Sequence, residues 1–261
     1  MFATEPLTAA ARKAVASLDK AKNRREMGVF KAEGTKCVLD TMDAFSVVCL
    51  YATAIWIDEH KELLSGYKCP VIKVTKADLE RMTSLITAPS VIALYRLPSP
   101  SELKASADDK LVLALDDLQD PGNMGTILRT ADWFGIRRIL CSANTVDCYS
   151  PKVVQATMGA IGRVKVEYAD SLADRLQDYA DGGINVYGTF LDGDNLYGGD
   201  IDAEGVIVIG NEGHGISPEV AKKVTHRLTI PDFGACKGES LNAAIATAII
   251  VSEFRRRQIA R

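Results

Sequence analysis

The first stretch of the chain whose residues could do chemistry is Leu111–Gly135. It begins with the apolar run Leu111–Leu115, continues into a turn that holds Asn123, and carries Arg129 six residues further on. An unbroken apolar run is typical of a strand that is buried on both faces, as in a parallel sheet. Because open α/β sheets bind ligands beyond the carboxyl ends of such strands, Asn123 and Arg129 are candidates to hold a polar ligand. The plainer alternative is an ordinary strand–turn–helix unit with a solvated arginine.

Two later stretches repeat this design. Val206–Ser217 runs from an apolar strand into a glycine-rich turn that carries the single acid Glu212. Leu228–Ala244 supplies a short strand, a flexible loop and a Ser-Leu-Asn sequence that opens a helix. Together with the first stretch, they give three polar turns in the last part of the chain.

The ordered motifs N-x5-R, I-G-N-E-G-x-G and I-P followed by S-L-N-x-A resemble the three signature motifs of the SpoU (TrmH-like) RNA 2′-O-ribose methyltransferases. Each motif alone is common, but the three in this order are specific. The resemblance implies a C-terminal α/β-knot domain with a parallel sheet, the trefoil-knotted SPOUT fold. It also implies S-adenosylmethionine as cofactor and a homodimer in which the partner subunit completes each site.

The resemblance assigns roles to the polar and glycine positions of the motifs. The implied catalytic residues are Arg129, Asn123, Glu212, Ser240 and Asn242. The implied cofactor-binding residues are Gly210, Asn211, Gly213, Ile230 and Leu241. Since a guanidinium essentially never loses its proton, we expect the arginine to orient the ribose or a phosphate and to stabilise the developing alkoxide. Helix capping is an alternative role for the two asparagines, and it is compatible with lining a site.

One loop departs from the family pattern. Between Pro231 and Ser240 the chain is longer than the usual motif, and Asp232 stands where an apolar residue is usual. We expect neither difference to abolish activity, while the cofactor contacts of Phe233–Glu239 stay open.

The N-terminal part of the chain alternates short strands and helices, which predicts a small α/β domain over residues 1–96. The expected strands are Val47–Tyr51, Ile55–Ile57, Val71–Val74 and Val91–Tyr95. The stretch Phe30–Lys36, with Ala88–Leu94 further on, resembles the small RNA-binding domain that often precedes the methyltransferase domain. Residues 97–110, rich in proline and serine, are the expected linker, and residues 111–261 the methyltransferase domain.

Charge gives a mixed indication about nucleic acid. The 261-residue chain has a net charge of −3, which does not favour nucleic-acid binding, although basic residues cluster near both ends. On the resemblance, the candidates to hold RNA phosphates are Arg24, Arg25, Lys31 and Lys36. The alternative is that these side chains only solvate a surface.

The sequence lacks the motifs that usually indicate several other classes of enzyme. The chain lacks the motifs of dinucleotide folds, P-loops, zinc hydrolases and serine hydrolases, and its three histidines have no metal spacing, so we expect no metal. Six cysteines without a C-x-x-C pair indicate free thiols in a reducing compartment. The first residues lack an apolar signal core and no run approaches membrane-spanning length, so we expect a cytoplasmic protein without a membrane partner.

The predicted activity is transfer of a methyl group from S-adenosylmethionine to a ribose 2′-hydroxyl in RNA, with ribosomal RNA preferred over transfer RNA. Two alternatives stay open. One is a non-catalytic RNA-binding paralogue of the same fold, and the other is a knotted methyltransferase that acts on an RNA base.

Overall fold

The computed structural model describes residues 7–103, 109–198, 201–234 and 240–259. The chain divides into two compact units. Unit 1 comprises Met1–Ser99 and Asp147–Gly162, and unit 2 comprises Pro100–Val146 and Arg163–Arg261. The first division falls within the expected linker. The segment Asp147–Gly162, however, was expected in the C-terminal domain and belongs instead to unit 1.

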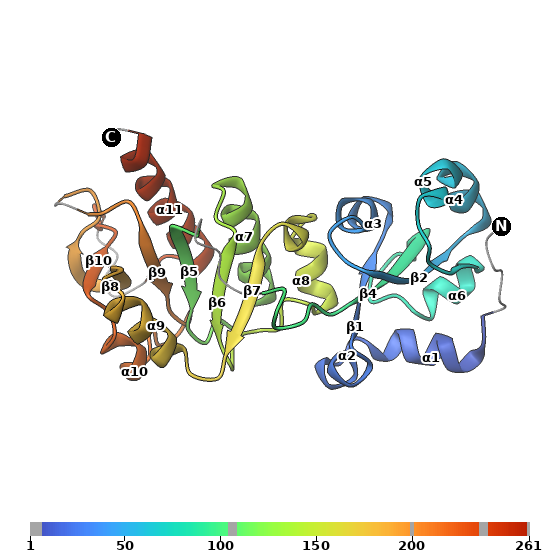
Figure 1. The fold of residues 1–261 in the computed structure, drawn as a ribbon, viewed down its shortest axis with the longest axis horizontal. Coiled ribbons are helices and arrows are strands. Elements are labelled where there is room, and N and C mark those ends of the chain that lie inside the picture. The colour runs from blue at the N-terminus through green and yellow to red at the C-terminus, as the bar shows by residue number, and fades with distance from the viewer. Residues whose placement is uncertain (1–6, 104–108, 199–200, 235–239, 260–261) are drawn as a thin grey trace. The chain divides into compact units, whose positions relative to one another are not determined.

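Unit 1 is built on a four-stranded sheet in the order β1-β4-β2-β3 (Figure 1). Strand β4 pairs antiparallel with β1 and β2, and β3 pairs parallel with β2. The strands are β1 (Val29–Glu33), β2 (Val47–Ala52), β3 (Val71–Lys73) and β4 (Val91–Arg96). The helices are α1 (Ala9–Ser17), α2 (Ala21–Met27), α3 (Thr35–Thr41), α4 (Ala54–Glu59), α5 (Lys61–Ser65), α6 (Lys76–Glu80) and α8 (Pro151–Ala156), with a 3₁₀ turn at Ala160–Gly162.

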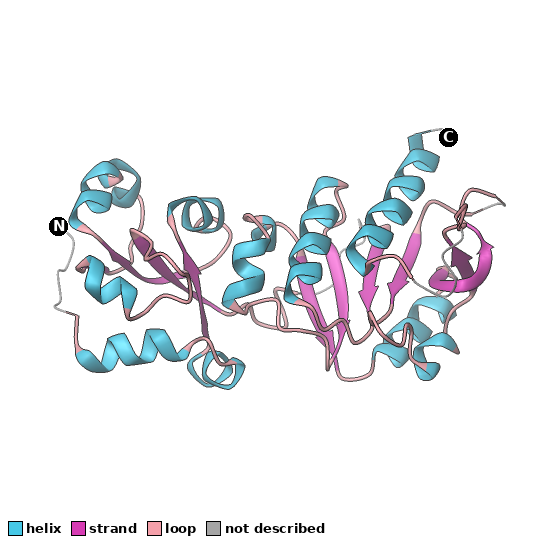
Figure 2. Cartoon of the chain, turned by 180° about the vertical axis from the view of Figure 1, so that it is seen from behind, coloured by secondary structure: helices cyan, strands magenta, loops and turns pink. Residues whose placement is uncertain are grey.

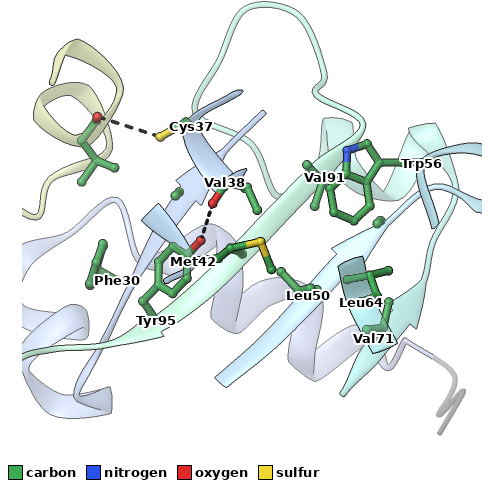
Figure 3. Close-up of a cluster of buried hydrophobic side chains, with 14 residues drawn as sticks. Phe30, Cys37, Val38, Met42, Leu50, Trp56, Leu64, Val71, Val91 and Tyr95 are labelled. Carbon is green, nitrogen blue, oxygen red and sulfur yellow. Dashed lines mark hydrogen bonds between the residues drawn. The ribbon is translucent and has the colours of Figure 1, made fainter. Parts of the chain in front are cut away.

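The core of unit 1 explains why residues 147–162 belong to it. Val154 of α8 is buried in the same cluster as Phe30 and Val38, and the ring of Tyr149 lies 4.9 Å from the ring of Phe30. Figure 3 shows the Cys37 thiol directed at a carbonyl oxygen, which is that of Val154 at 4.0 Å. This helix therefore completes a hydrophobic core that the first 99 residues leave open.

One predicted strand is wrong. Residues 55–57 lie in helix α4, not in a strand. The side chain of Thr53 accepts a hydrogen bond from the backbone N–H of Trp56, which caps the helix, and Trp56 is buried in the core. An apolar run this short does not distinguish the two periodicities, so capping and tertiary burial decide.

Unit 2 contains the expected parallel sheet, in the order β10-β8-β9-β5-β6-β7. Its strands are β5 (Leu111–Leu115), β6 (Arg138–Ser142), β7 (Lys165–Ala169), β8 (Val186–Asn195), β9 (Gly205–Ile209) and β10 (His226–Thr229). Its helices are α7 (Pro121–Trp133), α9 (Leu172–Asp181), α10 (Pro218–Ala221) and α11 (Ala243–Ile259). The predicted fold class, a parallel-sheet α/β domain preceded by a small α/β domain, is confirmed.

Helices cover the sheet of unit 2 on both faces. Side chains of α9 and α10 pack on the face that carries Val112, Ala114 and Val208. Helices α7 and α11 pack against each other on the opposite side (Figure 2). From β5 the chain builds outward through β6 to β7 and then returns to the other side of β5 through β8 and β9. The order therefore reverses between β5 and β9, which is where open sheets form a crevice for ligands.

Two helix starts differ from the expected positions. Helix α7 begins at Pro121, because the Asp120 carboxylate accepts a hydrogen bond from the backbone N–H of Asn123 at 2.7 Å. The helical periodicity of the sequence begins only at Thr126 and predicts a later start. Helix α11 begins at Ala243, three residues after the expected Ser240. In the described part of the chain, no helix is long and apolar enough to span a membrane.

Candidate functional site

The carboxylate of Glu212 lies at the crevice between β5 and β9 and accepts hydrogen bonds from three donors. Its Oε1 accepts from the side-chain amide of Asn123 at 2.9 Å and from the backbone N–H of Asp120 at 3.2 Å. Its Oε2 accepts from the backbone N–H of Gln119 at 3.2 Å. The loop after β9 is thus tied to the first turn of α7.

Asn242 extends this contact to a third segment. Its side-chain Nδ2 donates to the Oδ1 of Asn123 at 2.9 Å. Its own Oδ1 accepts from the backbone N–H groups of Ala244 and Ile245 at the start of α11. The chain Asn242–Asn123–Glu212 therefore fixes the orientation of both amides, and we refer to these three residues as the polar relay. Asn242 caps its helix and joins the relay at once, whereas the cap of α7 is Asp120 rather than Asn123.

The charge of Glu212 is stabilised by these donors. Burial raises the pKa of Glu212, but hydrogen bonds from Asn123, Gln119 and Asp120 lower it by more, so this carboxyl has a pKa below its ordinary value. The relay therefore contains a carboxylate that stays ionised at neutral pH.

The loop after β9 folds tightly on itself. The backbones of Asn211 and Gly215 exchange two hydrogen bonds of 2.9 and 3.0 Å, and the Asn211 side chain accepts from the N–H of Gly213 at 2.7 Å. A Cβ atom on Gly210 would lie 2.3 Å from the backbone of Gly215 and Ile216. Only glycine fits at position 210, because the two arms of the loop touch there.

Residue Asp117, which the motifs did not point to, connects three loops. Its backbone N–H donates to the Ser142 hydroxyl at 2.8 Å, and its carbonyl oxygen accepts from the Asn211 side chain at 2.7 Å. Its carboxylate accepts from Gln119 at 2.7 Å and lies 3.4 Å from the His214 ring. Its φ of +58° is left-handed, a conformation that aspartate tolerates better than most residues. The acidic cluster after a buried strand was the only signal for it in the sequence.

The structure does not bring Arg129 to the polar relay. Arg129 lies on the exposed face of α7, and among the described residues its guanidinium makes no hydrogen bond or ion pair. Six residues of α-helix separate it from Asn123, which turns the two side chains roughly 120° apart. The neighbour one turn further on, Trp133, is 86% exposed.

The other motif residues border a segment outside the described part of the chain. Ile230 follows β10 and is half-buried, while Ser240 and Leu241 precede α11 and are exposed. The lengthened loop Phe233–Glu239 lies outside the described residues from 235 on. At its start, Asp232 accepts a hydrogen bond from the N–H of Gly234 at 2.7 Å.

Two of the four predicted phosphate contacts in unit 1 are wrong, because the side chains are buried and already paired. Arg24 is 2% exposed and forms an ion pair with Asp147 at 2.5 Å. Lys31 is fully buried, pairs with Asp19 at 2.9 Å and Glu33 at 3.2 Å, and donates to a backbone carbonyl. Their charges stabilise unit 1 rather than face a ligand.

The other two candidates remain on the surface. Arg25 in α2 is exposed, and Lys36 in α3 is exposed with a contact of 2.9 Å to Asp40. An exposed i,i+4 pair of this kind is weak and leaves the lysine available to another anion. Within the described residues, no group of three or more histidine, cysteine or acidic side chains is arranged to hold a metal ion.

Comparisons with known proteins cover nearly the whole chain. Residues 110–252 match the model of the SpoU rRNA Methylase family, and residues 12–93 match that of the MRM3-like substrate binding domain. An uncharacterized tRNA/rRNA methyltransferase from Synechocystis is 31% identical over 94% of this chain and 90% of its own length.

Two solved structures share the fold over both units. A candidate RNA methyltransferase of the TrmH family from Porphyromonas gingivalis is 40% identical, with a TM-score of 0.86 over 96% of this chain and 99% of that one. An AdoMet-bound rRNA methyltransferase from Sinorhizobium meliloti is 28% identical, with a TM-score of 0.83 over 97% and 98% of the two chains.

Proposed function

Because the chain belongs to the SpoU rRNA methylase family, we propose that it transfers a methyl group from S-adenosylmethionine to the ribose 2′-hydroxyl of a nucleotide in RNA. Membership of the family was predicted from the three motifs and is confirmed. The choice of ribose over base, and of ribosomal over transfer RNA as substrate, belongs to the proposal.

The observation that carries the proposal is the polar relay at the crevice between β5 and β9. It joins one polar residue from each of the three motifs, Asn123, Glu212 and Asn242, through hydrogen bonds of 2.9 Å. Asn123, the middle member, is buried, and a buried amide is costly to leave unpaired. Glu212 and Asn242 satisfy its two ends, and a site that has lost its use has little reason to keep all three. The relay therefore favours an active enzyme over a non-catalytic paralogue.

The residues around the relay suit S-adenosylmethionine. The loop closed by Gly210 exposes backbone at Gly213 and Gly215, and Leu241 exposes 51% of an apolar side chain beside Asn242. An adenosine group has a flat apolar ring with polar edges, which such a mixture of apolar surface and backbone groups recognises. When bound, this cofactor supplies a methyl group on a positively charged sulfur. Gly210, Asn211, Gly213, Ile230 and Leu241 would hold it.

Methyl transfer makes a bond between the 2′-oxygen and the methyl carbon, breaks the bond from that carbon to sulfur, and releases the hydroxyl proton. Arg129 stays protonated, so its role is to orient the ribose or a neighbouring phosphate and to stabilise negative charge on the oxygen. The proton then passes to water or to a phosphate. Ser240 and the relay position the nucleotide, which is worth several kcal/mol when the reacting atoms are aligned.

The first experiment separates binding from chemistry. We expect Arg129→Ala to retain cofactor affinity within about twofold by calorimetry while methyl transfer to RNA falls by about 10²-fold or more, the size of losses seen when a charge-stabilising donor is removed. Arg129→Lys should recover part of the rate. Equal loss of binding and activity would contradict the assigned role.

The product distinguishes ribose from base as the acceptor. A methylated ribose blocks alkaline hydrolysis of the RNA on its 3′ side, because the 2′-oxygen can no longer attack the phosphate. Digestion to nucleosides should therefore yield a 2′-O-methylated nucleoside, and recovery of a nucleoside methylated on its base would exclude the proposed reaction. Binding of RNA without binding of S-adenosylmethionine would instead support the non-catalytic paralogue.

The proposal includes a homodimer with composite sites. Arg129 and the exposed Trp133 share one face of α7, and α11, which packs on α7, exposes Leu241 near its start and 52% of Ile245. A partner subunit seated on this face would receive Arg129 at its own site. Mixing Arg129→Ala with Asn242→Ala subunits should restore activity that neither variant has alone, whereas a complete site within each subunit predicts no recovery.

We further infer that the C-terminal segment forms the trefoil knot of the family and that the protein works in the cytoplasm. Residues 235–239, which belong to the proposed knot, lie outside the described part of the chain. Five described cysteines form no disulfide bond and four of them are buried, in keeping with a reducing compartment.

A further inference from the structure

A polar pocket lies at the amino-terminal ends of the strands in the sheet of unit 2. It has a volume of about 490 Å³ and is formed where β5, β6 and β9 begin. Its lining residues are Asp109, Lys110, Leu111, Gly135, Arg137, Ala203, Glu204, Arg255 and Gln258. The polar relay sits at the carboxyl ends of the same strands. Since a strand of five residues spans about 13 Å, the two sites are separate.

Arg255 of α11 is a partly buried cation without a carboxylate partner among the described residues. Its Nε donates to the Phe134 carbonyl oxygen at 2.7 Å and its Nη1 to Gln258. Its Nη2 has no partner in the described part of the chain. The next two residues of the helix, Arg256 and Arg257, both pair with Glu253 at 2.7 Å. Arg255 thus differs from its neighbours in carrying an uncompensated charge.

The surroundings of Arg255 make that charge costly. Burial lowers the pKa of its guanidinium below the ordinary value, because no nearby anion offsets the loss of water. Gly135 leaves the Nη2 side open, since even an added Cβ there would lie 3.9 Å away. An anion entering the pocket would relieve this cost and find a free donor.

Arg137 adds a second guanidinium to the same pocket. It is exposed, and its side chain makes no hydrogen bond or ion pair with a described residue. Lys110 and Glu204 pair with each other at 3.0 Å, so their charges offset. The guanidiniums of Arg137 and Arg255 have no carboxylate partner among the described residues, and Asp109 also lines the pocket. Two guanidiniums match the oxygens of a phosphate, and carboxylates accept from the hydroxyls of a ribose.

We propose that this pocket binds one nucleotide unit, with its phosphate on Arg137 and Arg255 and its sugar hydroxyls toward Asp109 and Glu204. The volume is within the range of pockets for ligands of that size. The nucleotide comes either from RNA or from a free mononucleotide. The RNA source rests on the proposed function, and the free mononucleotide does not.

Two probes applied to the full chain without cofactor test the site. Adenosine 5′-monophosphate is titrated by calorimetry, and a short single-stranded RNA by fluorescence anisotropy. Arg137→Ala and Arg255→Gln should each weaken binding of one probe by about tenfold, the effect of losing a charged hydrogen bond. The matched control is Arg256→Gln, which removes the same charge one residue away and should stay within about twofold.

Each outcome decides the proposal. Weakened mononucleotide binding identifies a free nucleotide as ligand, and weakened RNA binding alone identifies an RNA nucleotide. The proposal is overturned if neither probe binds the wild type, or if the control loses as much affinity as the two pocket variants. Because no methyl transfer is measured, failure of the proposed reaction would leave this test unaffected. Arg137, whose side chain is exposed and makes no hydrogen bond or ion pair with a described residue, serves as the variant with the smallest risk of unfolding.

Discussion

At the scale of the residue, the ionised state of Glu212 decides how the polar relay behaves with pH. The pKa of Glu212 is lowered in the folded protein, so its contribution to the free energy of unfolding is complete above the ordinary glutamate pKa of about 4.3. That contribution is lost as the pH falls from there through the lowered folded value. At neutral pH the relay keeps its full strength.

Glu212→Gln should therefore be less stable than the wild type at neutral pH, because an amide group would face the donors of Asn123, Asp120 and Gln119. Urea unfolding from about pH 7 to about pH 3 should show this difference shrinking below about pH 4.3. Glu219→Gln, at an exposed glutamate without a described partner, is the control. A difference that does not change with pH would show that the charge of Glu212 is not what stabilises the relay.

Gly210 tests the closure of the cofactor loop. Gly210→Ala places a Cβ 2.3 Å from the backbone of Gly215 and Ile216, so the two arms of the loop must separate. We expect a loss of about 1–3 kcal/mol in the free energy of unfolding, the usual cost of overpacking, and at least tenfold weaker binding of S-adenosylmethionine. Gly213→Ala, where the nearest atom is 3.5 Å away, should change the stability little. Similar losses in both variants would mean that the tight approach at Gly210 does not matter.

At the scale of the element, Asp117 shows how three loops are held at the carboxyl ends of the strands. We expect Asp117→Ala to lose about 1–2 kcal/mol through its left-handed backbone alone, in addition to the contact with Gln119. Asp117→Asn should be milder, because asparagine tolerates this conformation and keeps an acceptor oxygen. Thermal unfolding and cofactor titration of both variants check whether the alanine variant loses more than the asparagine variant. If alanine is tolerated as well as asparagine, the loops are held by other contacts.

Secondary structure was predicted correctly where burial imposes a simple pattern of apolar residues on the sequence. Strands β5 and β9 were predictable because they are buried on both faces and are therefore apolar throughout. The start of α7 was not, because Pro121-Gly122 is as typical of a turn as of a first helical turn, and the Asp120 side chain decides between them. The prediction for α4 was wrong for the same reason, because the cap formed by the Thr53 side chain outweighs a short apolar run.

The candidate site was predictable only in part. The order of the motifs predicted that Asn123, Glu212 and Asn242 belong together, and their hydrogen bonds agree. The role of Asp117 was not predictable, because it depends on a backbone angle and on partners from two other loops. The burial of Lys31 does have a signal in the sequence. Glu33 lies two residues further along the same strand, and residues two apart share a face.

At the scale of the whole molecule, the division into units does not follow the order of the sequence. The segment Asp147–Gly162 lies in sequence between the two parts of unit 2, but it folds as part of unit 1. It supplies the carboxylate that pairs with the buried Arg24 and the side chains that cover Phe30. The family match at residues 12–93 therefore describes a domain that needs a helix from beyond its own end.

A fragment of residues 1–99 should consequently be much less stable than unit 1 in the full chain. Removing Asp147 leaves the buried charge of Arg24 unpaired, which costs about 3–5 kcal/mol, and uncovering Val154's partners adds to it. That is a large share of the 5–15 kcal/mol that stabilises an ordinary domain, so we expect a loosely folded fragment with a broad urea transition. Adding a peptide of residues 147–162 should restore a cooperative transition, and the same peptide with Asp147→Asn should restore less. A fragment that unfolds cooperatively without the peptide would show that residues 1–99 are a complete domain.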